Sequence, residues 1–249
     1  KSEIPAAETM PDIQEAQVLL KVDGGIVGQG RMMPIDRIIY VVGTPQTFHF
    51  EQVFAVARRA GYLPEGVRAE HVGFGSVLGA DGKMLRTRAG GTVTLQSLLD
   101  EAEEVAVRPI AMAAVKYADL SNSLHKDYVF DVERMTATTG DTGPYLQYAH
   151  ARASQILRRA EAEGLTFAGV TVLAEPAEQA LALALSRFGE VVADVAENLQ
   201  PHKLCTYLFD LATAMSTFYE QCPVLRSEGE VRSSRLALCL AVQRVLASG

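Results

Sequence analysis

The sequence lacks long apolar runs, and it has few cysteines. No run of about 18 or more apolar residues occurs, so we expect no membrane span and no membrane partner. The first twelve residues show no positive region followed by an apolar one, so we expect no signal peptide. Cys205, Cys222 and Cys239 form no CxxC pair. This is typical of buried thiols in a reducing compartment, with no metal site.

Positive charge is also in deficit. Lys and Arg number 23 against 30 Asp and Glu, which gives a net charge of -7. This argues against nonspecific coating of nucleic acid, although an acidic protein can still carry a local basic site. The chain has 249 residues, 48% of them apolar, which is enough for two ordinary domains with their own cores.

The first hundred residues alternate between strand and helix patterns. Residues 36–42 (DRIIYVV) form a continuous run typical of a strand buried on both faces. Residues 50–61 have helical spacing, and a short strand around residues 71–78 and an apolar segment at 93–102 follow. This order predicts a βαβ unit and a parallel α/β sheet in a first domain of residues 1–104.

The remainder, residues 105–249, is typical of helices, with no strand-like run of comparable length. We expect helices at residues 109–121, 144–163, 176–198, 201–222 and 231–247. The first four begin near a proline, and Asp141 or Thr142 is the candidate N-cap of the second. We interpret this half as an all-α helical bundle.

A glycine-bounded loop, GKMLRTRAGGTV at residues 82–93, carries Lys83, Arg86 and Arg88. Three basic side chains in such a loop are suited to a ligand with several negative charges. A Walker loop needs Ser or Thr directly after its GK, and here Met84 follows Lys83, so this is not a Walker loop. A plain turn is the alternative interpretation.

Gln46 and His49 follow directly on the first predicted strand. In a parallel α/β sheet, residues just past the carboxyl end of a strand line the ligand crevice. This placement makes both residues candidates for substrate binding. The alternative is a glutamine that caps a helix and a histidine that packs.

The predicted helix at residues 144–163 carries Tyr145, Tyr148 and Arg152 beside an apolar stripe, followed by Gln155 and Arg159. Tyrosine faces can hold unpaired bases and arginines the phosphate backbone, so this pattern is suited to nucleic-acid binding. The alternative is an ordinary amphipathic helix with half-buried tyrosines and arginines in solvent.

Taken together, five segments of the chain resemble the second half of an arginyl-tRNA synthetase, a class I enzyme. They are RIIYVVGTPQTFHFEQVFAVARRAGYL, EHVGFGSVLGADGKMLRTRAGGTVTLQSLLDEA, AAVKYADLSNSLHKDYVFD, GDTGPYLQYAHARASQILRRA and PHKLCTYLFDLATAMSTFYEQCPVL. The resemblance implies the end of a Rossmann-type catalytic domain followed by an all-α anticodon-binding domain. It also implies ATP-dependent attachment of arginine to tRNA-Arg in the cytoplasm, with Mg2+ accompanying ATP and no tightly bound cofactor.

The resemblance also implies roles for individual residues. The loop at residues 82–93 stands in the place of the KMSKS loop, which clamps the ATP phosphates, so Arg86, Thr87 and Arg88 would be catalytic. Gln46 stands where the family has a glutamine that contacts substrate arginine. Tyr145, Tyr148 and Arg152 keep positions of an anticodon-binding motif. Tyr207 matches an aromatic residue near the anticodon pocket.

The chain departs from the family pattern in lacking the HxGH signature. Its five histidines, at positions 49, 71, 125, 150 and 202, all lie outside such a motif. We therefore expect a chain without the HxGH half of the active site, as a true deletion or as a fragment. The alternative functions are a non-catalytic, tRNA-binding or regulatory relative of the synthetase, or an interaction module whose helices only pack.

Overall fold

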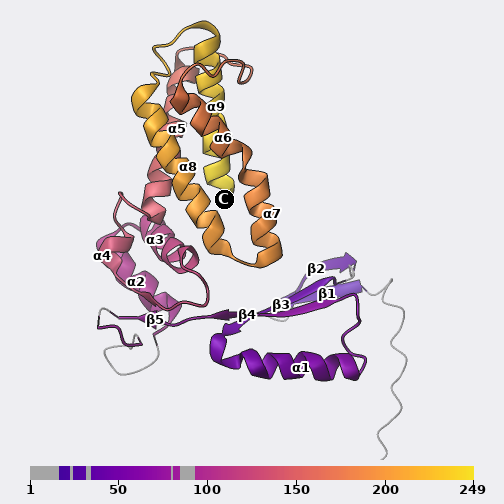
Figure 1. Cartoon of the computed structure of the whole chain (residues 1–249). Helices are drawn as coiled ribbons and strands as arrows, with labels where there is room; N and C mark the ends of the chain where they lie inside the picture. The colour runs from indigo at the N-terminus through magenta and orange to yellow at the C-terminus, as the bar shows by residue number, and fades with distance from the viewer. Residues whose placement is uncertain (1–16, 23–24, 32–34, 80, 85–92) are drawn as a thin grey trace, which may run out of the picture. The chain divides into compact units, whose positions relative to one another are not determined.

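The computed structural model describes residues 17–22, 25–31, 35–79, 81–84 and 93–249. The chain divides into two compact units, residues 1–72 and 73–249. Each unit is described by itself (Figure 1).

The first unit holds a hairpin and a strand–helix–strand segment. Its elements are β1 (Gln17–Val22), β2 (Gly25–Arg31), β3 (Arg37–Gly43), the short 3-10 helix η2 (Thr44–Gln46), α1 (Thr47–Arg59) and β4 (Arg68–Phe74), the last of which ends just beyond the unit. β1 pairs antiparallel with β2. β3 pairs with β4 in a second two-stranded sheet. The order strand, helix, strand agrees with the sequence prediction for this region.

Aromatic side chains join β3, α1 and β4. The ring of Tyr40, on β3, lies 5.0 Å from that of Phe50 and 5.5 Å from that of Phe54, both on α1. Phe50 also stacks on His71 of β4, with ring centroids 4.9 Å apart and an interplanar angle of 11°. The Nε2 atom of His71 lies 2.8 Å from the carbonyl oxygen of Val42. These contacts hold the helix against the paired strands.

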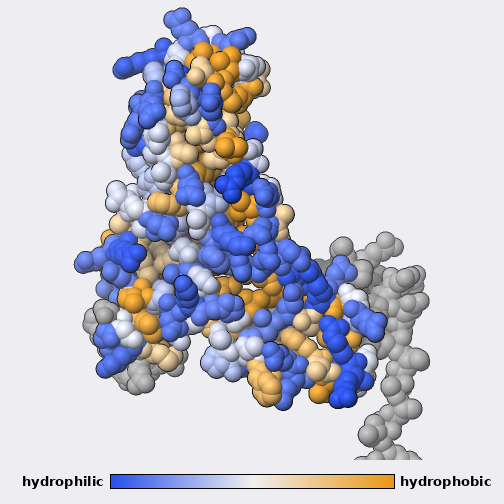
Figure 2. Space-filling model, in the orientation of Figure 1, coloured by the Kyte–Doolittle hydropathy of each residue, from blue (hydrophilic) through white to orange (hydrophobic). Residues whose placement is uncertain are grey.

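The prediction that the first strand is buried on both faces was wrong for the described residues. Ile39, Tyr40 and Val41 are 42%, 42% and 62% exposed. Among the described strands, β3 pairs only with β4, and α1 packs against it through Tyr40. Burial of both faces would need further elements packed on the sheet. Figure 2 shows apolar residues on the surface of this unit.

The single strand expected at residues 71–78 is split into β4 and β5 (Val77–Leu78). The split falls at Gly75, where a Cβ atom would overlap the backbone of Lys126 and Asp127. The amide of Gly75 donates to the carbonyl of Leu124 at 2.7 Å. β5 then pairs in parallel with β6 (Tyr128–Val129), a strand that the sequence pattern did not reveal.

The second unit is mainly helical. Besides β5 and β6 it contains α2 (Leu95–Val105), α3 (Arg108–Ser121), α4 (Val132–Met135), α5 (Gly143–Ala162), α6 (Pro176–Ser186), α7 (Phe188–Asn198), α8 (Pro201–Gln221) and α9 (Gly229–Ser248). Four expected helices are confirmed to within two residues at each end, namely α3, α5, α8 and α9. In Figure 1, α5, α6, α8 and α9 run beside one another as a bundle.

Two apolar clusters hold this unit together. The larger one lies within the bundle, where Leu211, Met215, Phe218, Leu236 and Val242 are fully buried. The smaller one lies among α2, α3 and α4 and contains Leu98, Ala102, Ala111, Ala114, Val115, Phe130 and Met135. α2 therefore packs on α3 across the domain boundary expected between residues 104 and 105, a boundary that stays a prediction.

The start of α5 is fixed against α3. Thr142 is the N-cap, and its hydroxyl accepts a hydrogen bond from the amide of Tyr145 at 3.2 Å. Gly143 lies so close to α3 that a Cβ atom there would overlap the carbonyl of Ala113. The hydroxyl of Tyr117 donates to Asp141 at 2.5 Å. Of the two candidate caps, Thr142 is confirmed, and Asp141 instead accepts from α3.

One helix prediction was wrong. The segment 176–198 is not a single helix but two, α6 and α7, which meet at Arg187. Arg187 has φ -83° and ψ -8°, a right-handed conformation that any residue can adopt. No proline or glycine is needed for such a break, so the hydrophobic pattern carries no mark of it.

Candidate functional site

The most distinctive surface cluster lies where α5 meets α8. The guanidinium carbon of Arg152 is 4.6 Å from the ring centroid of Tyr148 and 4.4 Å from that of Tyr219. Its Nη2 atom also donates to the hydroxyl of Tyr148 at 2.5 Å. The two tyrosines are 48% and 45% exposed. We call these three residues the tyrosine–arginine face.

Tyr145 lies one turn before Tyr148 but has a different environment. Its side chain is half-buried, its hydroxyl is 3.3 Å from that of Ser216, and its ring lies 5.6 Å from that of Phe209. It therefore connects α5 to α8 by packing. Its predicted role in binding tRNA stays a prediction.

Tyr207 is part of the bundle core in this structure. It is 7% exposed, its hydroxyl donates to the carbonyl of Ala184 at 3.0 Å, and its ring stacks on Phe188 at 6.0 Å. Burial raises the pKa of Tyr207, and the nearby charge of Arg187 offsets part of that rise. Its predicted contact with tRNA stays a prediction, and the structure gives the ring a packing role.

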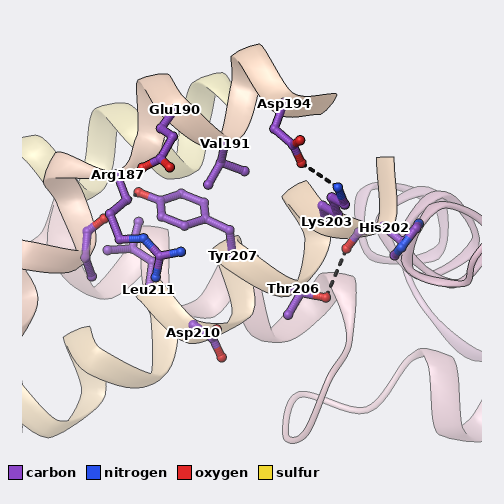
Figure 3. A pocket seen from close by; sticks show the side chains of 11 residues that line it. Arg187, Glu190, Val191, Asp194, His202, Lys203, Thr206, Tyr207, Asp210 and Leu211 are labelled. Carbon is purple, nitrogen blue, oxygen red and sulfur yellow. Dashed lines mark hydrogen bonds and ion pairs between the residues drawn. The ribbon is translucent and has the colours of Figure 1, made fainter. Parts of the chain in front are cut away.

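A surface pocket of about 400 Å³ opens beside Tyr207, between α7 and α8 (Figure 3). Its charged lining residues are Arg187, Glu190, Asp194, Lys203 and Asp210. The Nζ atom of Lys203 donates to Asp194 at 2.7 Å, and this contact holds the pKa of Asp194 below its ordinary value. Three carboxylates against two cations do not favour a polyanion such as an RNA backbone.

Gln46 and His49 lie where the sequence analysis placed them, just after β3. Both are exposed. Gln46 is the residue before α1, but its side chain makes no capping hydrogen bond, so the interpretation of a capping glutamine is not supported. The ring of His49 meets Phe50 edge-on at 5.7 Å. The structure thus places both side chains on the surface at the end of one strand.

Arg86, Thr87 and Arg88 lie outside the described residues, but the turn before them is described. The amide of Gly82 donates to the carbonyl of Gly79 at 2.9 Å, and that of Gly79 donates to Lys83 at 2.8 Å. Gly82 has a φ of +71°, which favours glycine. On the far side of the loop, Thr94 caps α2. A tight turn therefore leads from β5 into the basic loop.

The three cysteines are buried and free, as predicted. Burial raises the pKa of Cys205 to about 11 and that of Cys239 to about 12. Among the described residues there is no cluster of three or more His, Cys, Asp or Glu able to hold a metal ion. Within the same residues, no helix combines the length and apolarity needed to cross a membrane.

Comparison with known proteins gives this arrangement a family. Residues 24–111 match the family described as tRNA synthetases class I (R), catalytic domain, and residues 146–249 match the DALR anticodon binding domain. The arginine–tRNA ligase of Cutibacterium acnes is 64% identical over 226 residues, which are 86% of this chain and 41% of that protein. The chain belongs to the arginyl-tRNA synthetase family.

Other relatives agree. The arginine–tRNA ligase of Frankia casuarinae is 45% identical, with 97% of this chain and 46% of that protein covered. The solved structure of the Thermus thermophilus arginyl-tRNA synthetase matches 86% of this chain and 39% of its own, with a TM-score of 0.75 and 33% identity. The chain thus spans less than half the length of these relatives. The predicted fold class, part of a class I catalytic domain followed by a helical anticodon-binding domain, is confirmed.

Sequence reasoning found Tyr148 and Arg152 but missed Tyr219. A signal was present, because Leu208, Leu211, Met215 and Phe218 form the buried stripe of α8. Tyr219 directly follows the last of them and therefore points off that stripe. A large aromatic residue on the open side of an amphipathic helix was the mark that could have been used.

Proposed function

We propose that this chain takes part in the ATP-dependent attachment of arginine to tRNA-Arg. The observation that carries the proposal is that one chain holds both matches, to a class I (R) synthetase catalytic domain and to an anticodon-binding domain. The curated relatives reported above are named arginine–tRNA ligases. A non-catalytic relative is therefore not the favoured function.

On the catalytic side, the reaction joins the carboxylate of arginine to the α-phosphate of ATP and releases pyrophosphate. A hydroxyl of tRNA then takes the arginyl group from this adenylate, and AMP leaves. The protein mainly positions the reactants and stabilises the developing charge. Gln46 and His49 are proposed to contact arginine, and Arg86, Thr87 and Arg88 the ATP phosphates. Mg2+ would accompany ATP as part of the substrate. The proposal includes a cytoplasmic location, where protein synthesis uses charged tRNA.

On the tRNA side, the tyrosine–arginine face supports the proposal. Its two rings are about half exposed, whereas Tyr145 and Tyr207 pack within the bundle. Exposed aromatic rings stack on unpaired bases, and such stacking tolerates high salt better than contacts to phosphates. Of the tyrosines proposed to bind tRNA, Tyr148 is the exposed one, and Arg152 lies against its ring.

The proposal is tested by charging tRNA-Arg with radiolabelled arginine, using the gene product that contains these residues. We expect transfer that depends on ATP, arginine and tRNA-Arg together. The matched variant is Arg86→Ala with Arg88→Ala, which should lower the rate while leaving tRNA affinity unchanged. If the gene product binds tRNA-Arg but transfers no arginine to it, the catalytic proposal is wrong.

A further inference from the structure

The tyrosine–arginine face draws its residues from two helices. Tyr148 and Arg152 are one turn apart on α5, and Tyr219 comes from α8. The guanidinium of Arg152 lies over both rings, at 4.6 and 4.4 Å from their centroids. Arg152 therefore bridges the two helices at the surface and contacts both tyrosines at once.

We propose that Arg152 is a positioning residue that orders Tyr148 and Tyr219, and that Tyr219 contacts an unpaired base of tRNA. This proposal rests on the proposed function, since it needs tRNA as the ligand. It assigns a role to Tyr219, which the sequence motif did not single out. It also changes the role of Arg152 from a phosphate ligand to a support for the two rings.

Arg152 uses its guanidinium for contacts within the protein. A planar guanidinium stacks on aromatic faces and donates hydrogen bonds in a fixed geometry. Here both properties are used within the protein, because Arg152 meets two rings and donates to the hydroxyl of Tyr148 at 2.5 Å. Arg152 is itself only partly exposed. Less of its surface and fewer of its donors remain for a phosphate.

The rings of Tyr148 and Tyr219 are exposed and are already held in place by Arg152. A free surface tyrosine must lose rotamer freedom before it can stack on a base. Rings that are already held by the same cation lose less of that freedom on binding, which favours affinity. Tyr148 and Tyr219 keep 48% and 45% of their surface exposed. This surface suits the splayed, unpaired bases of a tRNA loop.

A separate residue is suited to the phosphate role. Arg159 lies seven residues after Arg152 on α5, two turns further along the same side of the helix, and it is exposed. It provides a matched comparison, since each variant removes one arginine from the same helix face. Removing a phosphate contact lowers the salt slope of binding by about one, whereas loss of a stacking support lowers affinity at all salt concentrations.

The experiment measures binding of the 249-residue chain to tRNA-Arg by fluorescence anisotropy at low and high salt. A 2-aminopurine base placed in the anticodon loop reports stacking through quenching. Tyr219→Ala should weaken binding roughly tenfold at both salt concentrations and reduce the quenching, since stacking on one ring contributes about that much. Tyr219→Phe should bind like the parent chain, because it keeps the ring.

For the arginines, Arg152→Ala should weaken binding at both salt concentrations with little change in salt slope, whereas Arg159→Ala should mainly lower the slope. Arg152→Lys should recover only part of the affinity, because an ammonium lacks the planar face. Thermal melting of each variant checks that it remains folded.

The outcomes separate this inference from the proposed function. If the parent chain does not bind tRNA-Arg, the proposed tRNA role and this inference both fail. If the parent binds and a folded Tyr219→Ala variant binds equally well, only the assignment of Tyr219 is overturned. If Arg152→Ala only lowers the salt slope, Arg152 is a phosphate ligand and its positioning role is overturned.

Discussion

Glu178 on α6 and Arg235 on α9 form a buried ion pair, with 2.5 Å between Oε1 and Nε and side chains only 1% and 8% exposed. Arg235 also donates to the carbonyl of Pro223 and the hydroxyl of Ser227, and Glu178 accepts from the amide of Glu175. The pair therefore joins two helices and the turn before α9. Because both charges are enclosed, loss of one partner leaves the other uncompensated.

We expect Arg235→Ala to lower the free energy of unfolding by about 3–5 kcal/mol, because it leaves the Glu178 carboxylate buried without its partner. Arg244→Ala, at an exposed position on the same helix, is the control and should change it by at most about 0.5 kcal/mol. Urea unfolding monitored by circular dichroism measures both. Equal effects of the two variants would contradict the structural role of the pair.

The ion pair of Glu178 and Arg235 also predicts how the free energy of unfolding depends on pH. Burial disfavours the charge on Glu178, but the amide of Glu175 and the guanidinium of Arg235 outweigh burial, so the pKa of Glu178 is lowered from 4.5. Because the pKa is lower in the folded state than in the unfolded state, the charged carboxylate stabilises the fold at pH values above the unfolded-state pKa. This stability is lost as the pH falls through the folded-state pKa. Glu178→Gln should therefore be less stable at neutral pH and lose less stability on acidification. The free energy of unfolding is measured as the pH is lowered. If it falls by the same amount in the variant and in the parent, the ion pair does not cause the loss of stability in acid.

Gly143 provides a test of the contact between α3 and α5. Gly143→Ala should destabilise the protein by about 1–3 kcal/mol, because the new Cβ atom would overlap the carbonyl of Ala113. Gly189 lies within α7 with nothing within 4 Å of an added Cβ atom. Gly189→Ala should stabilise by about 0.5–1 kcal/mol, since alanine favours the helix. Thermal melts of the two variants should therefore shift in opposite directions.

Much of the helical half could be predicted from sequence because its signals are local. Prolines mark the starts of α3, α5, α6 and α8, and Thr142 caps α5 through its own side chain. The break at Arg187 could not be predicted, because its dihedral angles are ordinary. The pairing of β5 with β6 depends on residues about fifty positions apart, which a local pattern does not connect.

In the candidate site too, some features could be predicted from local sequence and others depend on tertiary packing. Tyr148 and Arg152 are on one helix, so their spacing places them together. Tyr219 joins them only through packing of α8 on α5. Tyr207 has the same residue type as Tyr148 but lies on the buried side of α8, where its hydroxyl meets the carbonyl of Ala184. Residue type and motif position therefore indicate which helices carry the candidate site. Which of their tyrosines are exposed depends on tertiary packing.

The packing of α2 on α3 predicts how far the helical half can be shortened before it loses stability. A chain of residues 73–249 keeps Leu98 and Ala102 packed on α3, whereas a chain of residues 105–249 lacks them. Loss of the Leu98 contact alone removes about 1.5–3 kcal/mol of apolar burial. We therefore expect the shorter chain to unfold at lower urea. Equal midpoints would show that α2 does not contribute to this core.

On the catalytic side, Gln46→Ala in the gene product should raise KM for arginine far more than KM for ATP. A hydrogen bond from the glutamine amide to a charged substrate group is worth about 1.5–3 kcal/mol, or roughly 10- to 150-fold in KM. The 249 residues alone, which contain no HxGH signature, should show no arginine-dependent pyrophosphate exchange. Steady-state kinetics measure the first expectation and isotope exchange the second.

The central claim is that the exposed tyrosines of the helical half bind tRNA-Arg, and the most direct test is the affinity of Tyr148→Ala at high salt. Tyr207→Phe, a change within the core, is the control. With both variants shown by circular dichroism to be folded, we predict that Tyr148→Ala weakens tRNA-Arg binding by roughly tenfold at high salt, while Tyr207→Phe binds like the parent chain. Parent-like affinity of the folded Tyr148→Ala variant would contradict the claim and leave Tyr148 a structural residue.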